Sequence, residues 1–177
     1  MTLRPARLLA DKIQAELAPM CERIAIAGSI RRACPEINDI DLVILPLAGQ
    51  LQAIKARCLR KCLPAIDGPQ NFICRFPPTG PFRGLRLDIF FAHPEQRDLL
   101  SVIPSNWGSL LLCRTGSKEH NARLCSRALS MGLKWSPYRG LLGPATPGGE
   151  PDQVIASATE EDILAALGLE WIPPVVR

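Results

Sequence analysis

The spacing of apolar residues predicts that the chain opens with an amphipathic helix. The apolar positions that recur at helical spacing are Leu8, Leu9, Ile13 and Leu17. Pro5 is favourable at a first helical position, and Pro19 follows the last apolar position as a stop signal. A second helix is expected over residues 50–63, after the first two strands described next.

Four short segments in the first half of the chain have the pattern of β-strands. RIAIAG places Ile24 and Ile26 on one face of a short strand, whereas DIDLVILPL reads as a more deeply buried strand closed by Pro46. NFICRF and GLRLDIFF are two further strands, and PPTGPFRG between them is a loop because it is rich in proline and glycine. This half therefore mixes helices and strands around one sheet.

The second half has a different pattern, which predicts a second subdomain. From Pro94 it is expected to be mainly helical, with breaks at Pro104 and near Gly116 and a last long helix over residues 117–131. LKWSPYRGLLGPATPGGEPDQVIA reads as a short hairpin and a Pro/Gly-rich loop, and Thr159 caps a final helix. The expected fold class is α+β, with subdomains at residues 1–94 and 95–177.

Composition limits the classes of protein to which the chain can belong. Apolar residues make up 47% and charged residues 21% of the 177 positions, and no stretch approaches the roughly 18 apolar residues of a membrane span. The N-terminal segment lacks the apolar stretch of a secretory signal, so a cytoplasmic, soluble monomer without a membrane partner is predicted. The net charge of +4 permits a polyanionic partner without requiring one.

The seven cysteines are predicted to be reduced, structural thiols. Their number is odd and no C-x-x-C pair occurs, which argues against a disulfide framework and against a zinc site. Cys58 and Cys62 lie four residues apart on an expected helix.

Aspartates on the predicted strands are the first candidates for chemistry. Asp39 and Asp41 point to the same side of a strand because side chains at i and i+2 share a face, and Asp88 in RLDIF is a candidate third member. Carboxylates packed closely repel one another, whereas hard ions such as Mg²⁺ favour these oxygen ligands. Two such ions can activate a hydroxyl and stabilise a leaving pyrophosphate in a displacement at phosphorus.

A Gly-Ser pair ahead of these carboxylates favours nucleotidyl transfer over a simple polar strand end. Alone, Asp39 and Asp41 could merely solvate the start of a strand. Gly28 and Ser29 follow a strand directly, where a glycine turn exposes N–H groups and a hydroxyl to phosphate oxygens. Arg32 and its arginine neighbour come next and supply planar, paired donors for a triphosphate. A solvated structural turn remains the alternative.

The order of these motifs resembles the palm of family X DNA polymerases, the group of polymerase beta. G-S-x-R-R is followed by D-x-D ten residues after the serine, and WGSLLLCRTGSKEHNARL is similar to the T-G-S segment and the nucleotide-binding helix of this family. ATEEDILAALGLEWIPPVVR is similar to the closing segment of the family. The resemblance implies a nucleotidyltransferase palm with a mixed β-sheet flanked by helices, followed by a small α+β nucleotide-binding subdomain.

The resemblance also implies a role for each candidate residue. The carboxylates would bind two Mg²⁺ ions, with Mn²⁺ as a substitute, and Asp88 would serve the primer's terminal hydroxyl. The residues implied to bind the nucleotide are Gly28, Ser29, Arg32, Gly116, Ser117 and Asn121, and those implied to contact primer or template are Arg86, Lys118, Arg123 and Arg127. Arg86 could instead be a salt-bridged neighbour, Asn121 an ordinary helix-start residue, and the basic residues a solvated helix face.

Two positions depart from the family pattern. Cys113 and Arg114 stand where relatives often have an aromatic pair before T-G-S, which puts selectivity for dNTP over NTP in doubt. Cys125 stands where polymerase beta has an arginine that reaches the template, which predicts low fidelity. No lyase activity is expected, because little sequence precedes the palm helix.

The expected function is template-directed, distributive gap filling on DNA in repair or lesion tolerance. Few phosphate contacts predict weak, salt-sensitive binding to gapped or primer-template DNA. The alternatives are a nucleotidyltransferase with another acceptor, whether template-independent, RNA-directed or protein-modifying, and an inactive nucleic-acid-binding protein.

Overall fold

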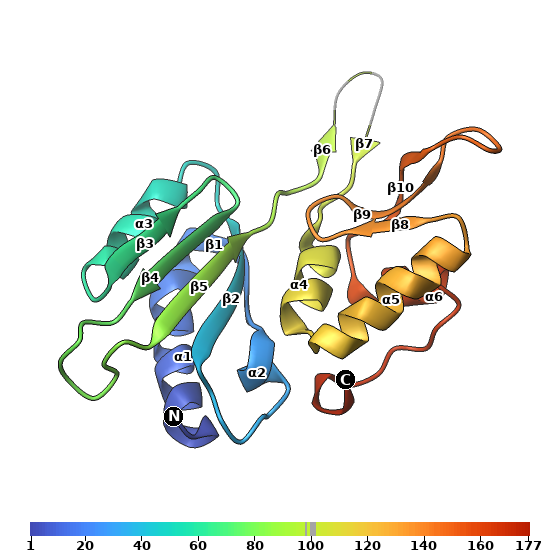
Figure 1. Cartoon of the computed structure of the whole chain (residues 1–177). Helices are drawn as coiled ribbons and strands as arrows, with labels where there is room; N and C mark the ends of the chain where they lie inside the picture. The colour runs from blue at the N-terminus through green and yellow to red at the C-terminus, as the bar shows by residue number, and fades with distance from the viewer. Residues whose placement is uncertain (98, 100–101) are drawn as a thin grey trace. The chain divides into compact units, whose positions relative to one another are not determined.

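A five-stranded sheet organises the first half of the chain in the computed structural model (Figure 1). Its strands run in the order β1-β2-β5-β4-β3, and their bounds are β1 (Cys21–Ile26), β2 (Asp39–Pro46), β3 (Leu63–Asp67), β4 (Asn71–Arg75) and β5 (Arg86–Phe91). β2 and β5 pair in parallel, whereas the other neighbours are antiparallel. The sheet is therefore mixed, as the sequence predicts.

The structure describes residues 1–97, 99 and 102–177. These residues divide into two units, Met1–Phe91 and Ala92–Arg177, called unit 1 and unit 2 below. The division falls between residues 91 and 92, whereas the sequence analysis places it between residues 94 and 95.

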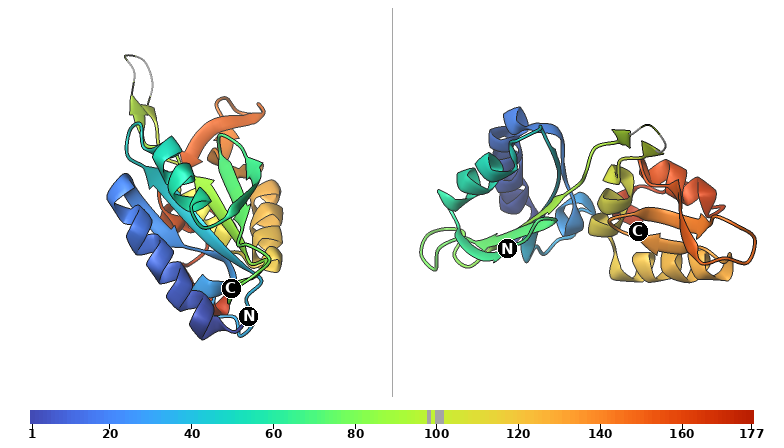
Figure 2. Two further views of the ribbon diagram at one scale, coloured as in Figure 1. Left: turned by 90° about the vertical axis from the view of Figure 1, so that its left-hand side faces the viewer. Right: turned by 90° about the horizontal axis from the view of Figure 1, so that it is seen from above.

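Helices cover one face of the sheet in unit 1. The helical segments are α1 (Leu3–Leu17), η1 (Ala18–Met20), α2 (Gly28–Arg31) and α3 (Leu51–Leu59). Figure 2 shows α1 and α3 on the same side of the sheet. The core between these layers contains Ile13 and Leu17 from α1, Ile54 from α3, and Ile40 and Leu42 from β2. Every second residue of β2 points into this core, so the residues between them are left on the opposite face.

The predictions for unit 1 need four corrections. α1 begins at Leu3, so Pro5 is its third residue, and Leu8 is exposed, so the buried stripe runs through Ala6 and Ala10 instead. α3 ends at Leu59 rather than at residue 63. Residues 63–67 form the unpredicted strand β3, which is an exposed edge strand and therefore lacks alternating burial.

In the described part of unit 2, three α-helices pack with a three-stranded sheet. The elements are α4 (Trp107–Thr115), α5 (Lys118–Ser130), α6 (Glu160–Ala166), β8 (Lys134–Ser136), β9 (Gly140–Pro144), β10 (Pro151–Ala156) and the short helix η2 (Pro174–Val176). α4 approaches the start of α6 so closely that a Cβ on Gly108 would lie 2.2 Å from the backbone of Thr159. The hydroxyl of Thr159 accepts a hydrogen bond from the amide of Asp162, which confirms the predicted cap of α6.

Two parts of unit 2 differ from the sequence expectation. The segment after Pro94 does not begin as a helix, because β6 (Gln96–Arg97) pairs with β7 (Val102–Ile103) in a small ribbon. Residues 98, 100 and 101, which fall in the expected helical stretch, lie outside the described residues. The segment expected to be a loop up to residue 156 includes β10, which pairs with β9.

Within the described part of the chain, no helix has both the length and the apolar character needed to cross a membrane.

Candidate functional site

The face of the unit 1 sheet opposite α1 and α3 carries the predicted carboxylates. In the parallel pair of β2 and β5, Asp39 lies opposite Arg86 and Asp41 lies opposite Asp88. Paired residues of neighbouring strands point to the same side of a sheet. The structure therefore brings all three aspartates to one face, together with Arg86.

Arg86 forms ion pairs with two of these carboxylates. Its Nη2 lies 2.6 Å from Oδ2 of Asp39, and its Nε lies 2.7 Å from Oδ1 of Asp88. Asp88 is nearly buried, with 4% of its surface exposed, whereas the side chain of Arg86 is 38% exposed. Burial alone would lower the pKa of Arg86, but the neighbouring Asp88 and Asp39 outweigh it and raise this pKa above its ordinary value.

These carboxylates do not form a ready-made metal cage. Among the described residues, no three carboxyl, thiol or imidazole groups lie together in a way that could hold a metal ion. Arg86 pairs with both Asp39 and Asp88 and supplies positive charge to these two carboxylates. The donor set still fits Mg²⁺ or Mn²⁺ chemically, because carboxylate oxygens are the ligands that hard cations prefer.

The turn between β1 and β2 meets this acidic face at Gly28. The φ of Gly28 is +59°, which favours glycine, and a Cβ there would lie 1.9 Å from Oδ2 of Asp41. The amide of Ala27 also donates a 2.8 Å hydrogen bond to the carbonyl of Asp41. The predicted phosphate turn and the predicted carboxylates are therefore direct neighbours.

Gly28 begins the short helix α2, Ser29 is its second residue, and Arg32 caps its end. The Oγ of Ser29 is buried and has no hydrogen-bond partner among the described residues. Arg32 closes the helix, with its amide donating to the carbonyl of Gly28 at 3.2 Å, and its side chain is half-buried. A hydroxyl without a partner beside a glycine turn is consistent with a place for a polar ligand.

In unit 2, the predicted nucleotide-binding residues lie where α4 ends and α5 begins. Gly116 has a φ of +72° and is joined to Ser117 by a cis peptide bond. Ser117 caps α5 by accepting a hydrogen bond from the amide of His120 at 3.2 Å. Asn121 donates through Nδ2 to the carbonyl of Cys113 at 2.8 Å, while its buried Oδ1 has no partner among the described residues.

The predicted DNA-contacting residues of α5 are exposed. Lys118, Arg123 and Arg127 all have exposed side chains, although Nε of Arg127 donates to the carbonyl of Leu167 at 3.0 Å. Exposure leaves both interpretations open, because phosphate-binding side chains and an ordinary solvated helix face are equally exposed.

The sequence analysis did not predict that Tyr138 contacts Arg114, next to the T-G-S segment. Arg114 lies over the ring of Tyr138, 5.8 Å from its centre, and donates a 3.3 Å hydrogen bond to the tyrosine hydroxyl. The chain thus supplies an aromatic ring beside the T-G-S segment from another element. No local sequence signal connects two residues this far apart in the chain.

Comparisons with known proteins agree with this architecture. Residues 110–177 match the family model of the DNA polymerase beta thumb. The whole chain is similar to Leishmania infantum polymerase beta in a ternary P/T complex, with 22% identity, a TM-score of 0.75 and 76% of that chain covered. It is also similar to the ternary gap complex of that polymerase, with 21% identity and a TM-score of 0.76, covering 100% of this chain and 70% of the other. The comparison with curated protein sequences gives no match.

Proposed function

We propose that this chain is a polymerase beta-like protein of the family X type. On this premise, it is a DNA polymerase that copies a template and fills short gaps. The observation that carries the proposal is the shared sheet face on which Asp39, Asp41 and Asp88 lie, with Gly28 in contact with Asp41. The two similar structures are a ternary P/T complex and a ternary gap complex, and we transfer these substrates to this chain.

The three aspartates would hold Mg²⁺, or Mn²⁺ in its place. When bound, such ions make the primer hydroxyl a better nucleophile and stabilise the pyrophosphate that leaves. Asp41 and Asp88 could bind the same ion, because they lie opposite one another in the register of β2 and β5.

Asp88 is the residue that we assign to the primer's terminal hydroxyl, as acceptor of its proton. Its burial excludes bulk water, and the ion pair with Arg86 fixes the direction of its carboxyl group. Arg86 is thus both a salt-bridged neighbour and, in this proposal, a residue near the primer end. Its pair with Asp39 orients the second carboxylate in the same way.

The turn at Gly28 would receive the β and γ phosphates of the incoming nucleotide. Ser29 would donate a hydrogen bond from its hydroxyl to a phosphate oxygen, because Oγ has no partner among the described residues. Arg32 would supply charge-assisted hydrogen bonds. These interactions bind the part of the nucleotide that becomes the leaving group.

Unit 2 would contribute the nucleotide sugar and base contacts and part of the DNA contact. We assign Gly116, Ser117 and Asn121 to the nucleotide, since the free Oδ1 of Asn121 is an acceptor available to a base. Lys118, Arg123 and Arg127 would neutralise DNA phosphates, which predicts strongly salt-dependent binding and distributive synthesis. Low fidelity, a role in repair or lesion tolerance, and a cytoplasmic location remain predictions.

Nucleotide incorporation into a one-nucleotide gapped duplex, with all four dNTPs and Mg²⁺ or Mn²⁺, tests the proposal. Wild type should add the templated nucleotide, and Asp41→Asn should lose this activity while it still folds. Asp11→Asn is the matched control, because Asp11 is an exposed helix residue paired only locally with Arg7. Untemplated tailing would indicate an end-adding enzyme instead, and binding without incorporation would indicate an inactive binding protein.

A further inference from the structure

Three cysteines lie together in the core of unit 1. Cys58 comes from α3, Cys62 from the connection between α3 and β3, and Cys74 from β4, and each is at most 5% exposed. All three are free thiols. Cys74 pairs with Leu87 on the core side of the sheet, opposite the face of the carboxylates, and the proposed polymerase chemistry uses none of the three thiols.

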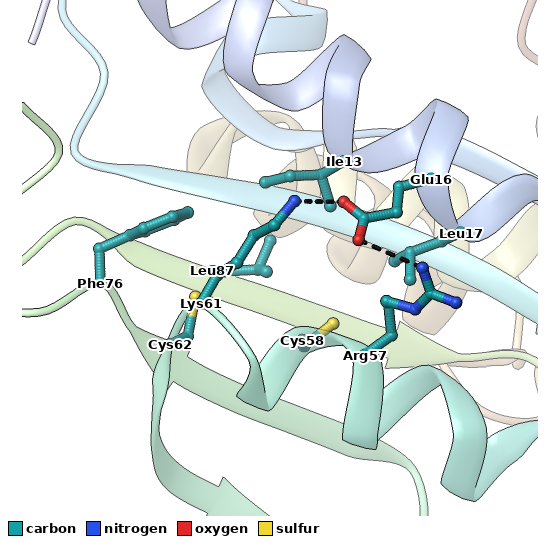
Figure 3. Close-up of a pocket in the computed structure, with 9 residues that line it drawn as sticks. All are labelled: Ile13, Glu16, Leu17, Arg57, Cys58, Lys61, Cys62, Phe76 and Leu87. Carbon is teal, nitrogen blue, oxygen red and sulfur yellow. Dashed lines mark hydrogen bonds and ion pairs between the residues drawn. The ribbon is translucent and has the colours of Figure 1, made fainter.

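A small cavity opens onto two of these thiols. Cys58 and Cys62 line it together with apolar side chains, and Glu16 lies at its edge in contact with Lys61 and with Arg57 at 3.6 Å (Figure 3). Its volume is about 20 Å³. A cavity needs about 10–15 Å³ to hold one water molecule, so this one admits a molecule of that size and excludes bulky reagents.

The strand register brings Cys62 close to Cys74. β3 and β4 pair Pro64 with Cys74, and Cys62 lies two residues before Pro64. Residues in this diagonal relation share a face and lie within side-chain reach. This proximity allows each thiol to shift the pKa of the other.

The three thiols differ in their tendency to ionise. The hydrogen bond from Cys74 lowers the pKa of the Cys62 thiol, burial opposes this, and the Lys61 ammonium lowers it further. The hydrogen bond to Cys62, followed by burial, raises the pKa of Cys74. Burial raises the pKa of Cys58 to about 12. Cys62 lines the cavity and lies beside the Lys61 ammonium, whereas Cys74 does not line the cavity. Cys62 is therefore the thiol that a small reagent reaches, and Cys74 is its neighbour.

We propose that Cys62 is a modification site for small hydroperoxides and that Cys74 converts the product into an intramolecular disulfide. The Cys62 thiolate attacks the terminal peroxide oxygen, so that an S–O bond forms and the O–O bond breaks. The leaving group is hydroxide from hydrogen peroxide, or an alkoxide from an organic hydroperoxide. This step oxidises the sulfur by two electrons and reduces the peroxide. The Cys74 sulfur then attacks the sulfenic acid, an S–S bond forms, the S–O bond breaks, and the Cys74 proton leaves with the hydroxyl as water.

This inference is independent of the proposed polymerase activity. It requires only that unit 1 is folded, because the cavity and both reacting thiols belong to that unit. The size of the cavity adds a second expectation. Hydrogen peroxide should react with Cys62 in the folded chain, whereas glutathione disulfide should not, because it is too large to enter.

The test is peptide mass mapping of the folded full chain after treatment with hydrogen peroxide. The expected product lacks two hydrogen atoms and contains a crosslink between the peptides of Cys62 and Cys74. In Cys74→Ser, the Cys62 peptide should instead gain one or more oxygen atoms, as the sulfenic acid or its further oxidation product, because Cys74 is no longer there to close the disulfide. Cys58→Ser is the matched control for removal of a buried thiol and should keep the crosslink.

Several outcomes would overturn the proposal. They are a crosslink between Cys58 and Cys62, oxidation confined to the exposed Cys125, equal reaction with glutathione disulfide, or no crosslink at peroxide concentrations that oxidise Cys125. The crosslink in wild type is mapped without any substitution, so the proposal remains testable even if a serine variant fails to fold. Circular dichroism before and after treatment checks that the reacting chain is folded.

Discussion

A methyl group on Gly28 would lie 1.9 Å from Oδ2 of Asp41, so the turn predicted to bind phosphate and the acidic face are in contact. Position 28 requires glycine for two separate reasons, and the contact is one of them. The backbone has a positive φ of 59°, and the space that a side chain would need is filled by the carboxylate. Any substitution at Gly28 must move Asp41 or the turn.

Gly28→Ala should therefore reduce incorporation about a hundredfold, because displacement of a reacting group by about 1 Å has an effect of this size. Gly49→Ala is the matched control, since Gly49 also has a positive φ, +77°, but a Cβ there meets nothing within 4 Å. Both variants should lose about 1–2 kcal/mol of unfolding free energy from backbone strain, measured in urea. Equal activity of the two variants would contradict a role for the contact with Asp41.

Arg86→Met should lower the free energy of unfolding by about 1–3 kcal/mol at neutral pH. The substitution leaves the nearly buried carboxylate of Asp88 without its ion pair, although the 38% exposure of the Arg86 side chain keeps the loss below that of a fully buried pair. Adding Asp88→Asn should recover part of the loss. Strict additivity in this double-mutant cycle, measured by urea unfolding, would show that the two residues are not coupled.

Asn121→Asp should cost about 1–3 kcal/mol of stability, because it replaces the donor to the Cys113 carbonyl by an acceptor. Asn38→Asp, at an exposed position, should have little effect on stability. If Asn121 also binds the nucleotide, KM for dNTP should rise in the surviving folded enzyme. An unchanged melting temperature of Asn121→Asp would contradict the structural role of this hydrogen bond.

Stability should fall as the pH is lowered from about 6.5, because of His120. Burial, together with Arg177 and Arg123, lowers the pKa of this imidazole, so the folded chain binds a proton less readily than the unfolded chain. The free energy of unfolding is therefore highest above the unfolded pKa and decreases as the pH falls toward the folded pKa. In His120→Gln, urea unfolding between pH 7 and 5 should show a smaller decrease, and an identical pH dependence would contradict this assignment.

Arg114→Tyr should change the preference for dNTP over NTP, because Arg114 occupies the position next to the T-G-S segment and covers Tyr138. Tyr138→Phe is a useful companion, since it removes the acceptor of the 3.3 Å hydrogen bond but keeps the ring. The ratio of kcat/KM for the two sugars measures the effect. An unchanged ratio of kcat/KM in Arg114→Tyr would show that residue 114 does not affect the preference for dNTP over NTP.

The apolar runs DIDLVILPL and GLRLDIFF were enough to place the aspartates on strands. Ile40 and Leu42 are buried, so Asp39 and Asp41 had to lie on the opposite face. The pattern could not reveal that Arg86 pairs with Asp39, because strand register depends on residues distant in the sequence. The position of the three aspartates on one face was thus predictable, whereas the pairing of Arg86 with two of them was not.

The elements that sequence analysis missed are those that bury little apolar surface. β3 is exposed along its whole length, so Leu63 and Ile66 give no alternating pattern. The stretch PEQR has good helix-forming residues, yet Gln96 and Arg97 form one side of a two-residue ribbon. Pairing with a neighbouring segment overrides local preference in both cases.

In the parallel pair of β2 and β5, the residues that stabilise the fold and the residues proposed to carry out chemistry lie on opposite faces of the sheet. A shift of the strand register by one residue would move Asp88 into the core layer that Leu87 and Ile89 occupy. Burial of the apolar face of each strand therefore fixes the position of the acidic face. Polar positions such as Asp41 can consequently mutate without erasing the architecture. A descendant that lost these carboxylates would therefore keep the fold of this sheet, whatever chemistry the carboxylates perform.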